Sequence, residues 1–573
     1  MFRAPNEKVP RAKPTTSSMV PVGIPFKGLN SAAPYSSMDP NEAISLNNVI
    51  IEAYGARTRK GYTEWAVGLP TEDPVHSILN YYPSTYDTQA QTWVGDNGLR
   101  YRDINQIGTA TPLSALGPGP GQIFAAQGTS IYNVTAGGAG PWTPEVGVTG
   151  VSPFWNGLNY QNVAGSFLLA ANEKGGYAIY DGTAWTMPSA GTNPEQISGV
   201  DPAKICWVVA WKERIWFFVV NSTVAYYLPP GQITGKATAF DFGTAMDHGG
   251  TLSFLGGWTL DGGIGVDDYL VAVGSQGDVV IYKGTDPNDI SAFALHGVWY
   301  AGPLPTGLRA VEGSGGDIHI LTQMGVIPVS GLMKPSNIGA QAKDRITAPI
   351  DPLVAALMRD YSTVEGWQLT TIAKEEIILI RLPPLTGTYL ENTFLAFKTT
   401  TKTWSVLSKL PYAHSINAGS LCYAGSMDGR VLRAFEGQLD DMKLNVPNKG
   451  IGIPCRVTPA YNPLGKPGIN KHLKMVRPYF LTSAEPKLTI TVLTNYSGPR
   501  AVFTPTVINP NDEDAWDSGV WDSARWGTNL RPLNNWYGCA GWGHAITVQL
   551  DYVAGGDTIL TSMDYWMGSG GVM

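Results

Sequence analysis

The sequence predicts an all-β protein built around a β-propeller of six to eight blades, with an N-terminal extended arm and a C-terminal β-sandwich-like domain. Three observations lead to this fold class. A strand–glycine turn–strand module recurs along the chain, its copies lie about 40–50 residues apart as propeller blades do, and its strands are apolar on both faces.

The clearest copy of the module is residues 269–284, YLVAVGSQGDVVIYKG. In its first strand Val271 and Val273 point one way, and Leu270 and Ala272, also apolar, point the other way. A strand that is apolar on both faces is typical of a sheet packed between two layers. Gly277 supplies the positive φ that a tight hairpin requires.

Further copies define the period. Residues 167–183 match residues 269–285 without gaps at seven positions, and residues 421–437 repeat the outline with a turn at Gly429. From residue 167 onward, the copies start 45 to 58 residues apart. Looser copies are expected at 93–103, 215–228 and 318–331, and as the longer pair 376–380 with 394–398.

The first 38 residues predict an extended N-terminal arm. Residues 1–38 contain six prolines and carry a net charge of +4, so little of this segment can form a core. It is either a disordered tail or an arm that becomes ordered on a neighbouring subunit, and we favour the arm.

Residues 39–74 predict a short capped helix followed by a strand hairpin. Asp39 is a good N-cap, Pro40 suits the first helical position, and Glu42 follows at the third. The hairpin ends in basic residues that are candidate partner contacts: Arg57, Arg59 and Lys60. They either contact a partner or nucleic acid phosphate, or they form a solvated strand face with the two arginines on the same side.

Residues 75–449 contain the modules and predict the propeller, with an inserted helix near 350–361 where apolar residues have helical spacing. After residue 450 the rhythm changes, and 450–573 predict a C-terminal β domain. This domain includes a tryptophan-rich loop between its strands.

The tryptophan-rich loop is the one stretch that could bind a glycan or Ca²⁺, since aromatic rings stack on sugars and carboxylates bind hard cations. Its candidate residues are Asp514, Trp516, Asp517, Trp521, Asp522 and Trp526. A turn-rich loop held by buried rings explains the same pattern.

The sequence predicts no catalytic, cofactor-binding or metal residue. Residues 231–236 (GQITGK) are one residue short of a phosphate-binding loop, and none of the seven histidines has the spacing of a zinc site. The four cysteines, Cys206, Cys422, Cys455 and Cys539, are far apart and predict thiols that are mostly buried. We therefore expect a protein that is not an enzyme and needs no cofactor.

Composition limits the partners. The chain has a formal net charge of −7 and only 15% charged residues. A protein that grips duplex DNA is normally basic, whereas a conduit through which DNA slides benefits from not attracting phosphates. The N-terminus does not predict a signal peptide, and no apolar run is long enough for a membrane span.

Three stretches resemble one family: 41–69 with YGARTRKGY, 211–329 with YYLPP and GDVVIYKGTDP, and the loop WDSGVWDSARW. Together they resemble propeller-built nozzle or head-completion proteins in the tails of short-tailed bacteriophages. The resemblance transfers no individual functional residue.

The resemblance implies a structural subunit of the virion tail, made in the host cytoplasm. It implies a homohexameric ring below the portal and adaptor that forms the channel for DNA retention and ejection, with genomic DNA passing through the lumen without sequence recognition. The alternative is a propeller-based tail protein that binds or degrades host glycan.

Overall fold

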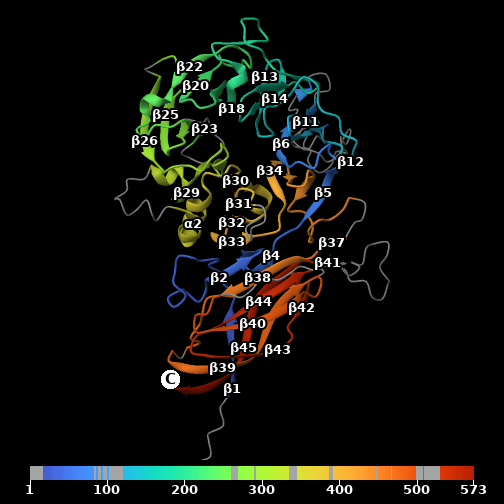
Figure 1. Ribbon diagram of the computed structural model, residues 1–573, viewed down its shortest axis with the longest axis vertical. Helices are drawn as coiled ribbons and strands as arrows, with labels where there is room; N and C mark the ends of the chain where they lie inside the picture. The colour runs from blue at the N-terminus through green and yellow to red at the C-terminus, as the bar shows by residue number, and fades with distance from the viewer. Residues whose placement is uncertain are drawn as a thin grey trace, which may run out of the picture. The chain divides into compact units, whose positions relative to one another are not determined.

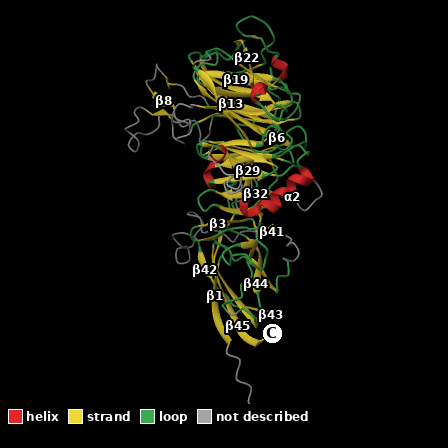
Figure 2. Ribbon diagram, turned by 90° about the vertical axis from the view of Figure 1, so that its left-hand side faces the viewer, coloured by secondary structure: helices red, strands yellow, loops and turns green. Residues whose placement is uncertain are grey.

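The computed structural model describes residues 17–82, 86–87, 92–94, 100–101, 121–259, 269–289, 292–333, 345–385, 392–444, 449–465, 467–498, 507–508 and 530–572. The chain divides into two compact units, Lys60–Ile451 and a terminal unit made of Met1–Arg59 with Gly452–Met573. Strands dominate both units (Figure 2). The predicted all-β class is confirmed.

Within Lys60–Ile451, antiparallel sheets follow one another along the chain, and in each the strands pair in sequence order. The first four sheets are β6 (Val75–Tyr81), β10 (Gln122–Gln127) and β11 (Ser130–Asn133); β13 (Trp155–Asn162), β14 (Gly165–Asn172), β15 (Tyr177–Tyr180) and β16 (Trp185–Thr186); β18 (Ile205–Trp211), β19 (Arg214–Val219), β20 (Val224–Tyr227) and β22 (Thr238–Asp241); and β23 (Leu252–Trp258), β24 (Tyr269–Gly274), β25 (Asp278–Gly284) and β26 (Phe293–Tyr300). The next are β27 (Val311–Ser314), β28 (Asp317–Thr322) and β29 (Gly325–Pro328); β30 (Gln368–Ile372), β31 (Ile377–Arg381), β32 (Phe394–Lys398) and β33 (Thr403–Leu407); and β34 (Tyr412–Ala418), β35 (Leu421–Ser426) and β36 (Val431–Ala434).

These sheets form a closed ring. The first strands contact one another in two runs, β6–β13–β18–β23 and β27–β30–β34, and β34 contacts β6 again. Figure 1 shows the sheets following one another around this ring. The strand β5 (Tyr62–Val67), which precedes the first sheet, pairs with β36 of the last sheet and with β12 (Gly138–Ala139). Radial antiparallel sheets around an axis, closed by an N-terminal strand, form a β-propeller.

The modules found in the sequence occupy equivalent places in this ring. Residues 167–183, 269–285 and 421–437 form β14–β15, β24–β25 and β35–β36, the second and third strands of their sheets. The pairs β19–β20, β28–β29 and β31–β32 do the same. The number of blades stays a prediction, because residues around β7–β9 lie outside the described part.

The expected module at 93–103 forms a strand pair, but it is not part of any of the sheets described above. The stretch 93–103 overlaps β8 (Thr92–Val94) and β9 (Arg100–Tyr101), which form a separate small sheet with β7 (Tyr86–Asp87). The equivalent pair is β10–β11, where Gly128 has a φ of +57° at the turn. The side chains of β10 and β11 are largely buried in the core, which the local turn pattern at 93–103 could not show.

The core of this unit lies between neighbouring sheets. Every residue of β24 is buried, as the apolar pattern on both of its faces predicts. One cluster joins the sheets that begin at β6 and β13, through Phe124, Trp155 and Tyr180. Each large apolar side chain buried this way stabilises the fold by about 1.5–3 kcal/mol.

The few helices connect the sheets. The helix α2 (Asp351–Tyr361) lies where helical spacing of apolar residues predicts one, and it buries Val354, Leu357 and Met358. The other short elements are α1 (Val329–Leu332), 3-10 turns at Pro202–Lys204, Phe242–Ala245, Ala348–Ile350 and Ala373–Glu375, and the strands β17 (Ile197–Ser198), β21 (Gly235–Lys236) and β37 (Gly450–Ile451).

The terminal unit consists of two sheets. One contains β3 (Val49–Glu52), β4 (Gly55–Thr58), β45 (Thr558–Val572), β39 (Ile469–Thr482) and β42 (Arg531–Leu533), with β1 (Ser17–Gly23) on β45 and β43 (Tyr537–Gly543) on β39. The other contains β2 (Ala43–Asn47), β38 (Ile453–Pro459), β44 (Ile546–Ala554) and β40 (Lys487–Thr494), and the short β41 is Val507–Ile508. The rings of Phe480 and Tyr552 meet between the sheets at 5.4 Å.

Two expectations for the N-terminal region differ from the structure. Residues 17–38 are neither a tail nor an arm on a neighbour, because β1 pairs with β45 over seven residues and Ile24 is fully buried. Residues 1–16 lie outside the described residues. The short helix expected from Asp39 is also wrong: Asp39 accepts from the N–H of Asn41 and Glu42 accepts from the N–H of Asp39, but β2 begins at Ala43. The capping contacts form, and sheet pairing with β38 then overrides helix propagation.

Candidate functional site

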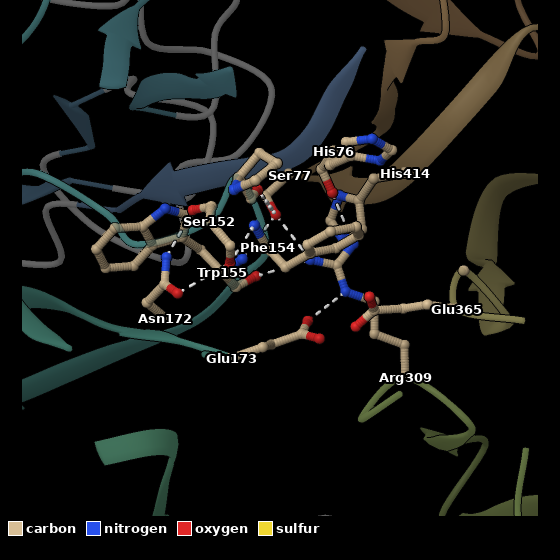
Figure 3. Close-up of polar contacts among 12 residues, drawn as sticks. His76, Ser77, Ser152, Phe154, Trp155, Asn172, Glu173, Arg309, Glu365 and His414 are labelled. Atoms are coloured by element: carbon tan, nitrogen blue, oxygen red, sulfur yellow. Dashed lines mark hydrogen bonds and ion pairs between the residues drawn. The ribbon is translucent and has the colours of Figure 1, made fainter. Parts of the chain in front are cut away.

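The axis of the propeller holds a cavity of about 290 Å³. Its walls come from the first strands of several sheets, with β6, β13, β27, β30 and β34 each contributing residues. Charged and polar side chains that are far apart in the sequence converge there. This cavity and the group around Arg309 form the candidate site, which we call the axial cluster (Figure 3).

Arg309 is the central member of the axial cluster. It lies just before β27, and its guanidinium reaches the two sheets that begin at β6 and β13. Its Nε donates to Glu173 Oε1 at 2.5 Å, and its Nη1 donates to the His76 carbonyl at 2.7 Å. Its Nη2 donates to Ser77 Oγ at 2.7 Å, and the guanidinium also lies over the Phe154 ring. The side chains of Arg309 and Glu173 are only 12% and 6% exposed, so this ion pair is shielded from water.

Two histidines of the axial cluster are held neutral. Burial, together with the charges of Arg381 and Arg309, lowers the pKa of His76 to about 4, and its ring stacks on Phe154 at 4.6 Å. Burial and the same two arginines hold the pKa of His414 well below its ordinary value. His414 Nδ1 accepts a hydrogen bond from the N–H of Ile78 at 3.1 Å, which joins the last sheet of the ring to the first.

A second guanidinium, that of Arg381, is buried near the histidines. It donates to the carbonyls of Tyr412 and Gly366 at 3.0 and 2.7 Å. Burial lowers its pKa to about 9, so it stays protonated at neutral pH. Backbone carbonyls therefore compensate this charge, as hydrogen bonding must for a buried cation.

Glu312 of β27 is the carboxyl group of the cavity with the most perturbed proton equilibrium. Burial raises its pKa to about 7, and a hydrogen bond from the N–H of Thr371 at 3.4 Å opposes this rise. Glu312 can therefore take up and release a proton near neutral pH. The hydrogen bonds of Arg309 and His414 in this cavity join sheets that are distant in the sequence.

A wider hollow of about 520 Å³ adjoins the axial cluster at Glu173. It lies among the turns between second and third strands and the loops that enter the sheets, and is lined by hydroxyl and amide groups such as Thr251, Ser253 and Gln276. Lys174 and Glu365 form an ion pair of 2.5 Å beside it. The hollow suits a polar ligand or a loop of a protein partner.

The basic residues singled out in the sequence have partners inside their own units. In the terminal unit, Arg57 forms an ion pair with Asp557 at 2.5 Å, and Arg59 is 2% exposed and donates to Asn48. The solvated-face interpretation is therefore wrong for Arg59. In the propeller unit, Lys60 pairs with Glu375 at 2.7 Å. Contact of these residues with an external partner stays a prediction.

The predicted glycan or Ca²⁺ loop, with Asp514, Trp516, Asp517, Trp521, Asp522 and Trp526, lies outside the described residues. Within the part of the chain that is described, no group of three His, Cys, Asp or Glu side chains could hold a metal ion. The prediction for the cysteines is confirmed: all four are free, and three are buried. None of the helices described here is long and apolar enough to cross a membrane.

Sequence reasoning missed the axial cluster. Glu173, Arg309 and His414 are separated by more than a hundred residues, so no local spacing connects them. One kind of signal was present: Glu173 lies two residues after the apolar run Phe167–Ala171, and His414 lies within the strand-like stretch 412–418. A charged or titratable residue within a buried strand usually has a specific partner.

Comparison with known proteins gives little further information. No protein-family profile and no curated protein sequence matches the chain. Solved structures that share similarity include Saccharomyces cerevisiae Sqt1 (10% identity, TM-score 0.34, 65% of this chain and 98% of that one) and Cyanidioschyzon merolae YCF48 (12%, 0.26, 65% and 98%). Chaetomium thermophilum Raptor is similar at 9% identity and a TM-score of 0.34, over 66% of this chain and 28% of that one. Likeness of this degree says nothing about function, and the propeller assignment rests on the sheet topology.

Proposed function

We propose that this chain is a structural subunit of the tail of a short-tailed bacteriophage. It would belong to the nozzle or head-completion ring below the portal and adaptor, act without catalysing a reaction, and reach the virion after synthesis in the host cytoplasm. The observation that carries the proposal is the sequence resemblance at 211–329. That stretch runs from the end of β18 to the start of α1, so the resembling residues build consecutive sheets of the propeller.

In this proposal the DNA does not run along the axis of a single propeller. Arg309 lines the axial cavity and joins the sheets of β6 and β13 to the connection before β27. The remaining cavity, about 290 Å³, holds only a small molecule. The conduit must therefore form between copies of the chain, and a homohexameric ring would surround it with rigid propellers as its wall.

The charge of the chain supports a passive conduit. With a formal net charge of −7, copies arranged in a ring would not bind the phosphate backbone strongly. Genomic DNA would pass through the lumen without sequence recognition, and retention would depend on tight packing around it. Weak attraction favours fast ejection, because a channel that bound the phosphates would have to release each contact as the DNA moved.

The test is the assembly state of the purified chain, measured by light scattering alone and with the portal and adaptor proteins of the same phage. We expect a complex with six copies of the chain that forms on the portal–adaptor ring. A portal–adaptor ring from an unrelated phage is the matched control and should not be bound. A chain that stays monomeric and binds neither protein would contradict the proposal, as would its absence from tails in a cryo-EM map of the particle.

A further inference from the structure

The terminal unit carries an exposed surface on the outer face of the sheet β1–β45–β39–β43. Met19, Trp566 and Met475 lie directly opposite one another on β1, β45 and β39. Directly opposed residues point to the same face of a sheet. Met19 is 50% exposed and Trp566 is 38% exposed, so this row faces solvent.

Two more tryptophans extend the row. The ring of Trp536 lies edge-on to that of Trp566, with 6.4 Å between the ring centroids. The Arg477 guanidinium lies over the Trp536 ring, 4.7 Å from its centroid. Trp542 is 54% exposed, beside His472. The outer aromatic surface is the set Met19, Met475, Trp536, Trp542 and Trp566.

The outer aromatic surface has the composition of a binding surface. Tryptophan, methionine and arginine are enriched where proteins bind one another, and tryptophan and arginine supply most of the energetically dominant contacts. Arg477 is paired with Asp564 at 2.7 Å, and Lys474 donates to Ser17 Oγ at 3.0 Å beside it, so these groups give the surface no net negative charge. A ligand for it should therefore offer apolar or rigid groups to the rings.

Residues 1–16 are a ligand of that kind within the same chain. They contain Pro5, Pro10 and Pro14, and aromatic-lined grooves bind proline-rich segments because these are extended before binding. The chain enters β1 at Ser17, which pairs with Gly568, two residues from Trp566. Sixteen residues can span up to about 50 Å, whereas neighbouring strands of the sheet lie only about 4.8 Å apart.

We propose that the outer aromatic surface binds the proline-rich residues 1–16 of this chain. The attachment at Ser17 raises the effective concentration of the segment, so even weak contacts would suffice. The segment is basic, with Arg3, Lys8, Arg11 and Lys13 against Glu7. Because the surface presents no net negative charge to these cations, binding would depend on prolines and rings, and would change little with salt.

The test uses a fluorescent peptide of residues 1–16 and the chain that begins at Ser17, with binding followed by anisotropy. We expect saturable binding that changes less than threefold between 50 and 300 mM salt. Replacing the three prolines by alanine, or Trp566→Ala in the protein, should weaken it at least tenfold. Tyr54→Ala is the matched control, since Tyr54 is 56% exposed in the same unit but lies on the β3–β4 turn, and it should bind normally.

The full-length chain provides the second measurement. Its own segment should compete, so the peptide should bind the full chain at least tenfold more weakly than the chain lacking residues 1–16. Circular dichroism checks that Trp566→Ala is folded. The milder variant Met19→Ala, which removes another side chain of the same surface, should also weaken binding of the peptide. No binding up to millimolar peptide would overturn the proposal. Dimerisation of the chain lacking residues 1–16 that Trp566→Ala abolishes would also overturn it, because a second copy would then occupy the surface.

Discussion

Glu173→Gln is the sharpest perturbation of the axial cluster. The substitution keeps the shape of the side chain and removes its charge, so Arg309 keeps its bonds to His76 and Ser77 but loses its only carboxylate partner in the described structure. Both side chains are at least 88% shielded from solvent. A buried guanidinium without an anion is strongly unfavourable.

The magnitude follows from this burial. Removing one partner of a buried ion pair costs about 3–5 kcal/mol. The propeller unit, Lys60–Ile451, has about 390 residues, for which an unfolding entropy of about 2.1 cal/mol/K per residue gives a shift of about 1.2 °C per kcal/mol. We therefore expect the melting temperature of this unit to fall by about 4–6 °C.

Differential scanning calorimetry on the full chain measures this shift. The matched control is Glu365→Gln, which removes the neighbouring but exposed pair with Lys174, whose side chains are 49% and 39% exposed. It should change the melting temperature by less than about 1 °C, since exposed pairs contribute about 0–1 kcal/mol. The double variant Glu173→Gln with Arg309→Met should recover part of the loss. Equal, small effects of the two glutamine variants would refute the reasoning.

Three further predictions concern the same unit. The pKa of Glu312 is raised to about 7, so its protonated form is favoured in the fold. Its contribution to the free energy of unfolding is complete below about pH 4.5 and is lost as pH rises through 7. In urea titrations from pH 5 to 8, Glu312→Gln should therefore gain stability relative to the parent as pH rises, and a constant difference between the two would contradict this. The pKa of His76 is lowered to about 4, so the neutral ring is favoured in the fold. Its contribution to the free energy of unfolding is complete above about pH 6.5 and is lost as pH falls toward 4. His76→Phe should therefore shift the midpoint of acid unfolding to lower pH, and an unchanged midpoint would count against this. Gly277→Ala should lower the free energy of unfolding by more than about 2 kcal/mol, because at a φ of +97° the new methyl would lie 2.1 Å from the Gly302 carbonyl oxygen. Gly231 has a φ of +74° with open space around it, so Gly231→Ala should lower it by only about 1–2 kcal/mol. Similar melting temperatures for the two variants would disprove the steric argument.

The repeating part of the fold was predictable because its information is local. A glycine turn between two short apolar runs determines a hairpin, and the hairpins at 167–183, 269–285 and 421–437 all became second and third strands. At 93–103 the same signal marks a strand pair, β8–β9, that belongs to a separate small sheet. The local pattern failed at Asp39, where capping residues are present but pairing of β2 with β38 prevails.

The axial cluster was not predictable in the same way, because only ring closure brings its members together. Glu173 follows β14, Arg309 precedes β27, and His414 belongs to β34. Their positions become neighbours once the sheets surround an axis, and no pattern within one blade contains that information. Local sequence indicates that a residue such as Glu173 needs a partner, but not which partner.

The ring of sheets is closed in two places, at its outer edge and near its axis, by different interactions. At the outside, β5 and β36 pair through backbone hydrogen bonds, joining Tyr62 to Ala434. Near the axis, His414 binds the N–H of Ile78, and Arg309 spans to the sheets of β6 and β13. Backbone pairing at the edge can fray, whereas the axial bonds lie among partly buried side chains. If the outer strand alone closed the ring, Glu173→Gln would destabilise only the turn that contains Glu173. Because the axial bonds join distant sheets, the substitution should lower the stability of the whole propeller, which should still unfold in one cooperative transition.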